Sequence, residues 1–517
     1  MKKQSLIKGT FILGIAGILA KFLGLFFRWP LIMLIGDEGV GYYQMSYPLY
    51  MFFIAIASGV PVAISKMVSE EKAIGNNEGI IQVFKKSMLL MIIIGGGFSA
   101  FLFIFSKQLI QFFKWDVKSY YSLIGIASAP IFISIMSAFR GFFQGLQNMS
   151  PTAVSQIIEQ IGRVFFGIGL AYILLPKGIE YAAGGAAFGA TAGGIFGGIY
   201  LFFRYMSIKR ELNINKVKDN LFILTKLIYI SIPISLGATV GSIMSLIDSA
   251  LVPQKLLEAG YSYKQATILY GQLTGKAFVL VNVPLTISIA LCASIVPIIA
   301  EFYILNRKGE LVEKVNLAIK FSMVIALPSF LGLFFLSAPV MRLLFPGHSQ
   351  GYEILKYLSI SIPFIIITQT TTAILQGVGR YLRPVLNLVI GCIVKIIITV
   401  TLVPIPDLNI YGAVVGSIMG YLISSILNIR CLKQTLKISL NYYEIMIKPM
   451  YASVIMIIGV IYIYITAFDY TWSNALACLI AVFSGILIYS ILIVLMRIFS
   501  YSYFKHKFLK YKRRDNR

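Results

Sequence analysis

Long apolar runs alternate with short charged or turn-rich breaks along the whole chain. There are fourteen runs, most of them at or above the roughly 20 apolar residues that a helix needs to cross a bilayer. They cover about 8–35, 41–65, 86–106, 120–143, 152–175, 181–203, 222–252, 269–300, 317–338, 352–376, 384–403, 410–430, 448–467 and 475–497. The pattern predicts an all-α polytopic membrane protein with about fourteen transmembrane helices, several of them kinked by internal prolines.

Composition narrows the class of protein further. The mean hydropathy is +0.84, and 13% of the residues are charged, against roughly 25% in a typical soluble domain. The four cysteines lie in or beside apolar runs without disulfide or metal-site spacing. No Walker loop, nucleophile elbow, HExxH motif or paired-carboxylate constellation occurs in the chain. We therefore expect a protein that is not an enzyme and that uses no metal and no cofactor.

The positive charge could suggest nucleic acid, because 45 Lys and Arg residues face 20 Asp and Glu residues. Their distribution argues for a membrane instead. One alternating set of segments holds 32 of these cations and the opposite set holds 8. Because cytoplasmic loops carry the excess of Lys and Arg, we expect a multi-pass cell-membrane protein with both termini in the cytoplasm and no nucleic-acid partner. The basic tail Lys505–Arg517 is expected to contact anionic lipid headgroups.

An internal repeat relates the first six predicted spans to the next six. Residues 185–193 match residues 412–420, Gln144 pairs with Gln376, and nineteen residues beyond each glutamine comes a cation. Six spans are an even number, so both copies would keep one orientation and form parallel lobes related by a pseudo-twofold axis along the membrane normal. The alternative is a chance recurrence of glycine spacing. The predicted divisions are an N-terminal lobe 1–215, a C-terminal lobe 216–436, helices 13 and 14 within 437–500, and a tail 501–517.

Charged residues inside the spans are the candidates for function, since each is costly in a membrane and usually faces a cavity or a partner. Lys21 and Arg28 lie seven residues apart in the first span. Two helical turns place them on one face, roughly 10 Å apart along the axis. Such a stripe suits anionic groups that pass along the helix. Snorkelling of Arg28 to the interface and a structural salt bridge of Lys21 are the alternatives.

The fifth span carries a second group of polar residues. Glu159 and Arg163 are spaced i,i+4 and are expected to form an intrahelical ion pair. Gln156, Gln160 and Arg163 share one helix face that is a candidate cavity lining. A self-satisfied structural pair is an equally good interpretation.

Three further ionisable residues lie deep in predicted spans. Asp248 is a candidate cation or proton site, or a structural partner of a buried lysine. Lys276 and Lys395 are each either a cavity cation or a snorkelling side chain. The glycines that crowd residues 184–198 are interpreted as close helix packing.

Several motifs resemble one known family. They are Lys8-Gly9-Thr10, Lys21 to Gly24 with Arg28, Ile35 to Gly41, Pro61 to Lys66, Arg140 to Met149, and Ser155 to Gln160. These segments, with the length and the span count, resemble the stage V sporulation protein B family. Its members are polysaccharide-export-type proteins of the multidrug/oligosaccharidyl-lipid/polysaccharide exporter superfamily and are more distantly related to lipid II flippases.

The resemblance implies movement of an undecaprenyl-diphosphate-linked peptidoglycan precursor from the inner to the outer leaflet, serving the spore cortex. Lys21 and Arg28 correspond to a basic first-span pair of the lipid II flippases, with Lys at the first position and a spacing one residue longer. The implied mechanism is alternating access by rocking of the two halves. The expected partners are the lipid-linked anionic glycan, anionic lipid headgroups and cell-wall synthesis proteins, and the expected state is a monomer.

Three alternatives remain open at this point. One is a cation-coupled multidrug exporter, which should favour acidic residues inside the membrane. The predicted spans instead hold five cations against Glu159 and Asp248, which favours an anionic substrate. The others are a flippase for a teichoic or capsular lipid-linked oligosaccharide and a non-transporting scaffold of a wall-synthesis complex.

Overall fold

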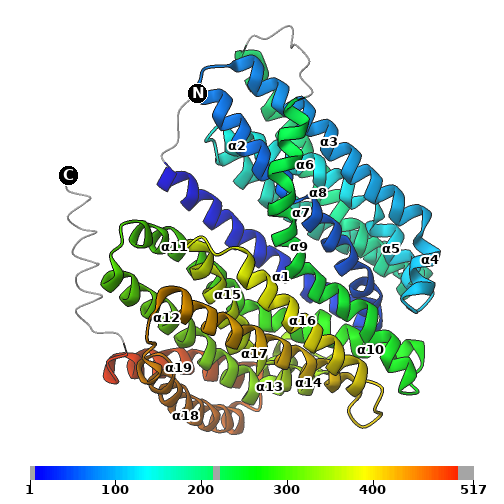
Figure 1. Ribbon diagram of the computed structural model, residues 1–517. Helices are drawn as coiled ribbons and strands as arrows, with labels where there is room; N and C mark the ends of the chain where they lie inside the picture. Colours follow the sequence, from blue (N-terminus) through cyan, green and yellow to red (C-terminus); the bar gives the residue numbers. More distant parts are fainter. Residues whose placement is uncertain (1–5, 213–221, 499–517) are drawn as a thin grey trace. The chain divides into compact units, whose positions relative to one another are not determined.

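The computed structural model describes residues 6–212 and 222–498, and these contain helices and no strand (Figure 1). The prediction of an all-α fold is confirmed. The chain divides into two compact units, each described here by itself. Unit 1 holds the residues up to Gly275 together with Thr399–Ala413, and unit 2 holds Lys276–Ile398 and the residues from Val414 onward.

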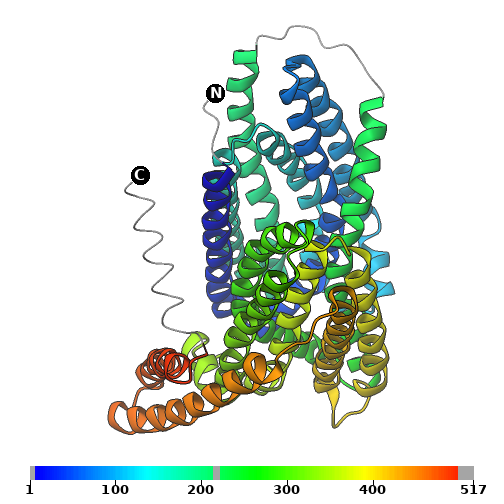
Figure 2. The ribbon, with the colours of Figure 1, turned by 60° about the vertical axis from the view of Figure 1, so that its left-hand side comes forward.

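Unit 1 is built from long helices connected by short turns. Its elements are α1 (Leu6–Ala57), α2 (Gly59–Ala73), α3 (Asn77–Ile104), α4 (Ser106–Phe112), α5 (Ser119–Ala127), α6 (Ala129–Gly145), α7 (Ser150–Leu174), η1 (Leu175–Lys177), α8 (Ile179–Leu212), α9 (Phe222–Glu258), α10 (Tyr263–Gly271) and most of η2 (Gln272–Ala277). The dark-blue first part of α1 runs beside α7 and α8, as Figure 2 shows.

A sharp break divides α1 at Gly36, where φ is 61° and ψ is −169°. This backbone conformation is accessible in practice only to glycine, because a Cβ atom would clash with the backbone. The break turns one continuous helical run into two arms, and the second arm carries Tyr43 and Tyr47. Gly36 therefore divides α1 into two helical arms that run in different directions.

Eleven helices of the described residues are long and apolar enough to cross a membrane, or twelve when the bent pair Tyr352–Leu358 and Ser361–Gly377 is counted. The first of these runs from Ile12 to Ala73 and contains the break at Gly36. The count of candidate spans rises from eleven to fourteen with three additions. The run Ile12–Ala73 is divided into two crossings, the bent pair is counted as one span, and α9 is counted as one span. The protein is thus a multi-pass membrane protein.

Glycines bring α7 and α8 into close contact, as the sequence predicts. A Cβ atom on Gly193 would lie 2.5 Å from the backbone oxygen of Glu159, and one on Gly189 would lie 2.7 Å from that of Arg163. Neither distance leaves room for a side chain. The small residues of α8 therefore serve close helix packing and hold α7, with its polar face, in place.

Unit 2 contains the remaining helices, apart from the segment Thr399–Ala413 that belongs to unit 1. They are α11 (Phe278–Ile304), α12 (Lys308–Phe335), α13 (Ser337–Leu344), α14 (Tyr352–Leu358), α15 (Ser361–Gly377), α16 (Leu382–Leu402), α17 (Asn409–Leu436), η3 (Tyr443–Ile447), α18 (Lys448–Thr471) and α19 (Asn474–Leu495). The last two, at the red end of the colours in Figure 1, pack against each other and on α12. The Tyr489 hydroxyl donates to the Val324 carbonyl at 3.0 Å and joins α19 to α12.

The compact units do not divide the chain where the predicted repeat does. Residues 222–275, which the repeat assigns to the second lobe, pack in unit 1 against α1 and α2. The Gly59 amide donates to Ser235 Oγ at 3.1 Å, and Trp115 Nε1 donates to the Ser249 carbonyl at 2.6 Å. The repeat concerns sequence similarity and the units concern contacts, so the boundary between 215 and 216 stays a prediction.

Candidate functional site

Arg28 of α1 is half-buried and held by the second arm of the same helix. Its Nη1 atom donates to Gln44 Oε1 at 2.8 Å. Its guanidinium carbon lies 5.1 Å from the centre of the Tyr43 ring and 5.7 Å from that of Tyr47, within the range of a cation–π interaction. Arg28 is therefore held by residues of the second arm of α1 within unit 1.

Glu159 of α7 lies between two arginines. Its Oε1 atom is 3.4 Å from Arg163 Nη2, which confirms the predicted i,i+4 ion pair. Its Oε2 atom is 3.0 Å from Arg140 Nη2 on α6. Arg140 also donates through Nε to Ser155 Oγ at 2.9 Å. The carboxylate is about nine-tenths buried, so its two charged partners offset the cost of removing it from water.

Tyrosines of the second arm of α1 connect these two groups. The Tyr43 ring stacks on Tyr47 at a centroid distance of 5.4 Å, and both Arg28 and Arg163 lie within electrostatic range of Tyr43. Arg163 is also within electrostatic range of Tyr47 and Tyr50. We call this set the arginine–tyrosine cluster: Arg28, Tyr43, Gln44, Tyr47, Tyr50, Arg140, Glu159 and Arg163. Three guanidinium groups and one carboxylate give the cluster a formal charge of +2.

Two polar atoms on α7 keep unused hydrogen-bonding capacity. Arg163 Nε and Gln156 Oε1 are buried and have no hydrogen-bond partner within the described part of the chain. Buried polar groups are normally hydrogen-bonded, and exceptions call for an explanation. One donor and one acceptor on the same helix suit contact with a polar ligand.

The other predicted site residues lie elsewhere. The side chain of Lys21 falls outside the described residues. Asp248 is buried in unit 1, within electrostatic range of Tyr270. Lys276 of unit 2 is fully buried and donates to the carbonyls of His348 at 2.5 Å and Gln350 at 3.4 Å. Lys395 is 1% exposed, in α16.

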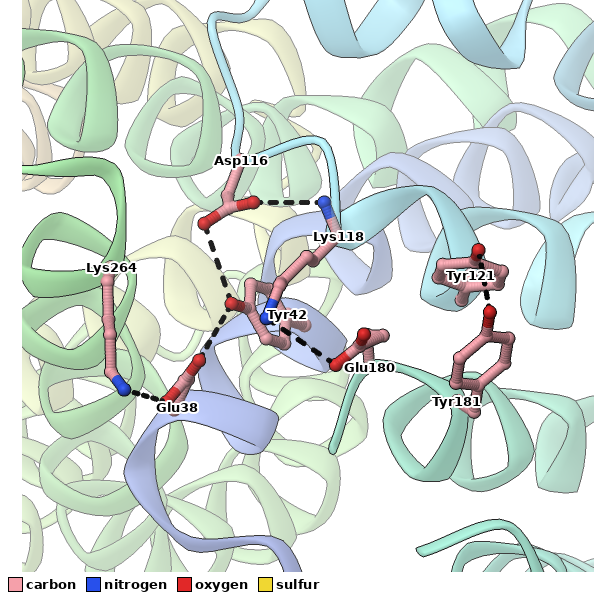
Figure 3. Close-up of polar contacts among 8 residues, drawn as sticks. All are labelled: Glu38, Tyr42, Asp116, Lys118, Tyr121, Glu180, Tyr181 and Lys264. Atoms are coloured by element: carbon pink, nitrogen blue, oxygen red, sulfur yellow. Dashed lines mark hydrogen bonds and ion pairs between the residues drawn. The ribbon is translucent and has the colours of Figure 1, made fainter. Parts of the chain in front are cut away.

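A second polar cluster joins four segments of unit 1 (Figure 3). Tyr42 donates to Glu38 Oε1 at 2.9 Å and lies 3.5 Å from Asp116 Oδ2. Glu38 Oε2 is 3.1 Å from Lys264 Nζ of α10. Lys118 Nζ is 3.7 Å from Glu180 Oε2, and the Lys118 amide donates to Asp116 Oδ1 at 2.9 Å. With its carboxylates partnered in this way, the cluster fastens α1, the turn before α5, α8 and α10 together.

Sequence reasoning missed most of the partners in these clusters. It did not list Arg140 as a site residue, and the structure shows Arg140 within α6 in an ion pair with Glu159. It also passed over Tyr43, Gln44 and Tyr47. The one available signal was the recurrence of tyrosines and other polar residues along 42–50 in an otherwise apolar span.

The fold defines a class of protein, an all-helical polytopic membrane protein. The structure aligns with the lipid II flippase MurJ in its inward closed conformation, with a TM-score of 0.71, 16% identity, and 93% and 98% of the two chains covered. It also aligns with an inward-facing multidrug resistance MATE family transporter of the MOP superfamily, with a TM-score of 0.68, 15% identity, and 81% and 95% covered. At these identities the likeness concerns the fold.

The sequence comparisons give the family. The model of the family described as "Polysaccharide biosynthesis protein" matches residues 6–303. Stage V sporulation protein B of Bacillus subtilis (strain 168) is 31% identical over 456 residues, which cover 86% of each chain. The lipid II flippase MurJ of the same organism is 27% identical over 472 residues, covering 86% of this chain and 85% of that one. The chain belongs to the polysaccharide biosynthesis protein family, with stage V sporulation protein B and MurJ among its relatives.

Proposed function

We propose that this protein moves an undecaprenyl-diphosphate-linked peptidoglycan precursor, similar to lipid II, from the inner to the outer leaflet. The observation that carries the proposal is the arginine–tyrosine cluster, with its formal charge of +2, inside a membrane-spanning unit. Guanidinium groups match the geometry of phosphate oxygens and hold them with charge-assisted hydrogen bonds. Tyrosine hydroxyls both donate and accept, which suits the hydroxyl and amide groups of a sugar.

The relatives support the same class of substrate. One relative is named as a lipid II flippase and another as a sporulation protein. We therefore propose spore cortex synthesis as the process served, and alternating access as the mechanism. Division of the chain into two compact units suits a mechanism in which one half moves against the other.

We also carry the predicted topology forward as part of the proposal. The 32 to 8 distribution of cations favours cytoplasmic termini. The basic tail Lys505–Arg517, which lies outside the described residues, would then contact anionic headgroups of the inner leaflet.

The charge of the cluster argues against an exporter of organic cations. Three guanidinium groups repel a cationic drug, and the single carboxylate among them, Glu159, is already paired twice. A flippase for a teichoic or capsular lipid-linked oligosaccharide would share the diphosphate chemistry. The experiment must therefore separate these substrates.

The test is a leaflet-accessibility assay with the full-length protein in vesicles. Labelled lipid II, a teichoic acid lipid precursor and the cation tetraphenylphosphonium are supplied in parallel. We expect protein-dependent movement of lipid II and no movement of the cation. Movement of the cation without lipid II, or of the teichoic precursor alone, would overturn the proposal. Accumulation of the precursor on the cytoplasmic leaflet of depleted cells, with expression confined to sporulation, would support the cellular role.

A further inference from the structure

Glu159 is the only carboxylate among the described members of the arginine–tyrosine cluster, and two helices hold it. Arg140 of α6 approaches it to 3.0 Å, closer than the 3.4 Å of Arg163 on α7 itself. Arg140 is fixed in turn by Ser155, whose hydroxyl accepts from Arg140 Nε and donates to the Thr152 carbonyl at 2.7 Å. Arg163 contacts Glu159 through Nη2, while its Nε atom has no hydrogen-bond partner among residues 6–212 and 222–498. Arg140 is thus the firmer partner of the carboxylate, and Arg163 keeps capacity for a ligand.

The second copy of the repeat shows that close packing of this helix pair does not need the carboxylate. The shift that aligns Gln144 with Gln376 and Arg163 with Lys395 is 232 residues, and it aligns Glu159 with Gly391. Gly391 makes the same kind of close contact with the next helix: a Cβ atom on it would lie 2.5 Å from the carbonyl oxygen of Gly420. The helix pair therefore packs closely with glycine where the first copy has glutamate.

The same shift aligns Arg140 with Thr372 and Ser155 with Asn387. In unit 2, Asn428 Nδ2 donates to Thr372 Oγ1 at 3.1 Å, and Asn387 Nδ2 donates to Asn428 Oδ1 at 2.8 Å. Neutral groups joined through Asn428 of α17 thus occupy the positions of Arg140 and Ser155 in unit 2, where the position of Glu159 is a glycine. Since neutral bonds suffice to hold this arrangement, the charges of unit 1 have a purpose beyond packing.

We infer that Glu159 and Arg140 are positioning residues that set the charge of the arginine–tyrosine cluster, and through it the affinity for a diphosphate. The inference rests on the proposed function. A diphosphate that links a lipid to a sugar carries two negative charges, which match the +2 of the cluster. A transporter must also release what it binds, and a cluster of +3 would hold the diphosphate too tightly for turnover. Glu159 removes that third charge, and Arg140 prevents it from neutralising Arg163 fully.

Charge-changing variants of similar shape separate this role from a structural one. Glu159→Gln raises the formal charge of the cluster to +3, Arg140→Gln lowers it to +1, and the double variant returns it to +2. A unit charge about 8 Å from one negative charge of the ligand, at an effective dielectric constant of about 20, changes affinity by about thirtyfold, and screening by salt lowers this to roughly tenfold. The probe is lipid II in detergent, with affinity measured by titration and movement measured in vesicles.

We expect Glu159→Gln to bind lipid II about tenfold more tightly and to move it more slowly, and Arg140→Gln to bind it about tenfold more weakly. The double variant should return to within about threefold of the wild-type affinity. A merely structural pair would weaken binding in all three variants, in proportion to their loss of thermal stability. Glu310→Gln, at an exposed position of α12, is the matched control and should bind normally.

The outcomes are distinguishable from failure of the proposed function. Absence of lipid II binding by the wild-type protein would overturn the proposed function itself. Wild-type binding without tighter binding by Glu159→Gln, or a double variant more than tenfold weaker, would overturn the charge-balance inference. If the single variants fail to fold, the double variant carries the test, because it removes the Arg140–Glu159 pair together and leaves neither of these two charges buried without the other.

Discussion

Arg28 offers the sharpest test of the proposed binding site. Arg28→Gln removes the positive charge and leaves an amide that still reaches toward Gln44, so the change is mild for the fold. The wild-type side chain donates at 2.8 Å to Gln44 and lies 5.1 Å from the Tyr43 ring centre. Under the proposed function, this charge would contact a phosphate of the lipid-linked precursor.

The expected loss follows from the kind of bond removed. A hydrogen bond to a charged group contributes about 1.5–3 kcal/mol, which corresponds to a lipid II dissociation constant about 10- to 150-fold higher. Arg28→Lys keeps the charge but loses the planar fork and the stacking on Tyr43 and Tyr47. We expect it to lie between the wild type and Arg28→Gln.

The assay is titration with lipid II, accompanied by thermal unfolding in the same detergent. Arg307→Gln, an exposed arginine paired with Glu310 at 3.5 Å, is the control and should bind like the wild type. Arg28→Gln binding within threefold of the wild type would refute the assignment of Arg28 to the site. The same refutation follows if the control loses as much affinity as Arg28→Gln.

Three further predictions concern stability, read as the free energy of unfolding. Gly36→Ala should destabilise the protein by about 1–3 kcal/mol, because alanine does not tolerate the backbone at φ 61°. Gly97→Ala, in open space on α3, should instead stabilise it by roughly 0.5–1 kcal/mol; equal effects would refute the argument from the break. Lys276→Met should lower the free energy of unfolding by about 1–3 kcal/mol, because the loop carbonyls that accept from Lys276 lose their donor. An unchanged midpoint of thermal unfolding would contradict this. Tyr489→Phe should cost about 0.5–1.5 kcal/mol by removing the bond to Val324, and a neutral result would show that the bond adds nothing.

The local part of the site could be predicted from the sequence. Glu159 and Arg163 are four residues apart, and helical geometry alone brings such side chains together. The apolar periodicity likewise predicted the helices, since a span must satisfy its backbone hydrogen bonds internally whatever its neighbours are. The glycines of α8 were correctly interpreted as packing residues, because only small residues allow two helices to approach so closely.

The partners across helices could not be predicted in this way. Arg140 and Glu159 are 19 residues apart and lie on different helices, and nothing in the spacing shows that they meet. Lys276 and Lys395 resembled Arg28 as isolated cations in apolar runs, yet they lie in unit 2, and Lys276 is held by loop carbonyls. Which of several similar cations joins a cluster depends on the rotation and contact of each helix.

The sequence by itself determined the class of protein, the helical fold and the net positive charge of the chain. Those properties follow from hydropathy, helix periodicity and net charge, which are sums over residues or relations within one helix. The tertiary structure decided that Arg28, Arg140 and Arg163 share one cluster with a single carboxylate. The physical reason is that electrostatic balance depends on distances of a few ångströms between helices, and only the packing of those helices determines them.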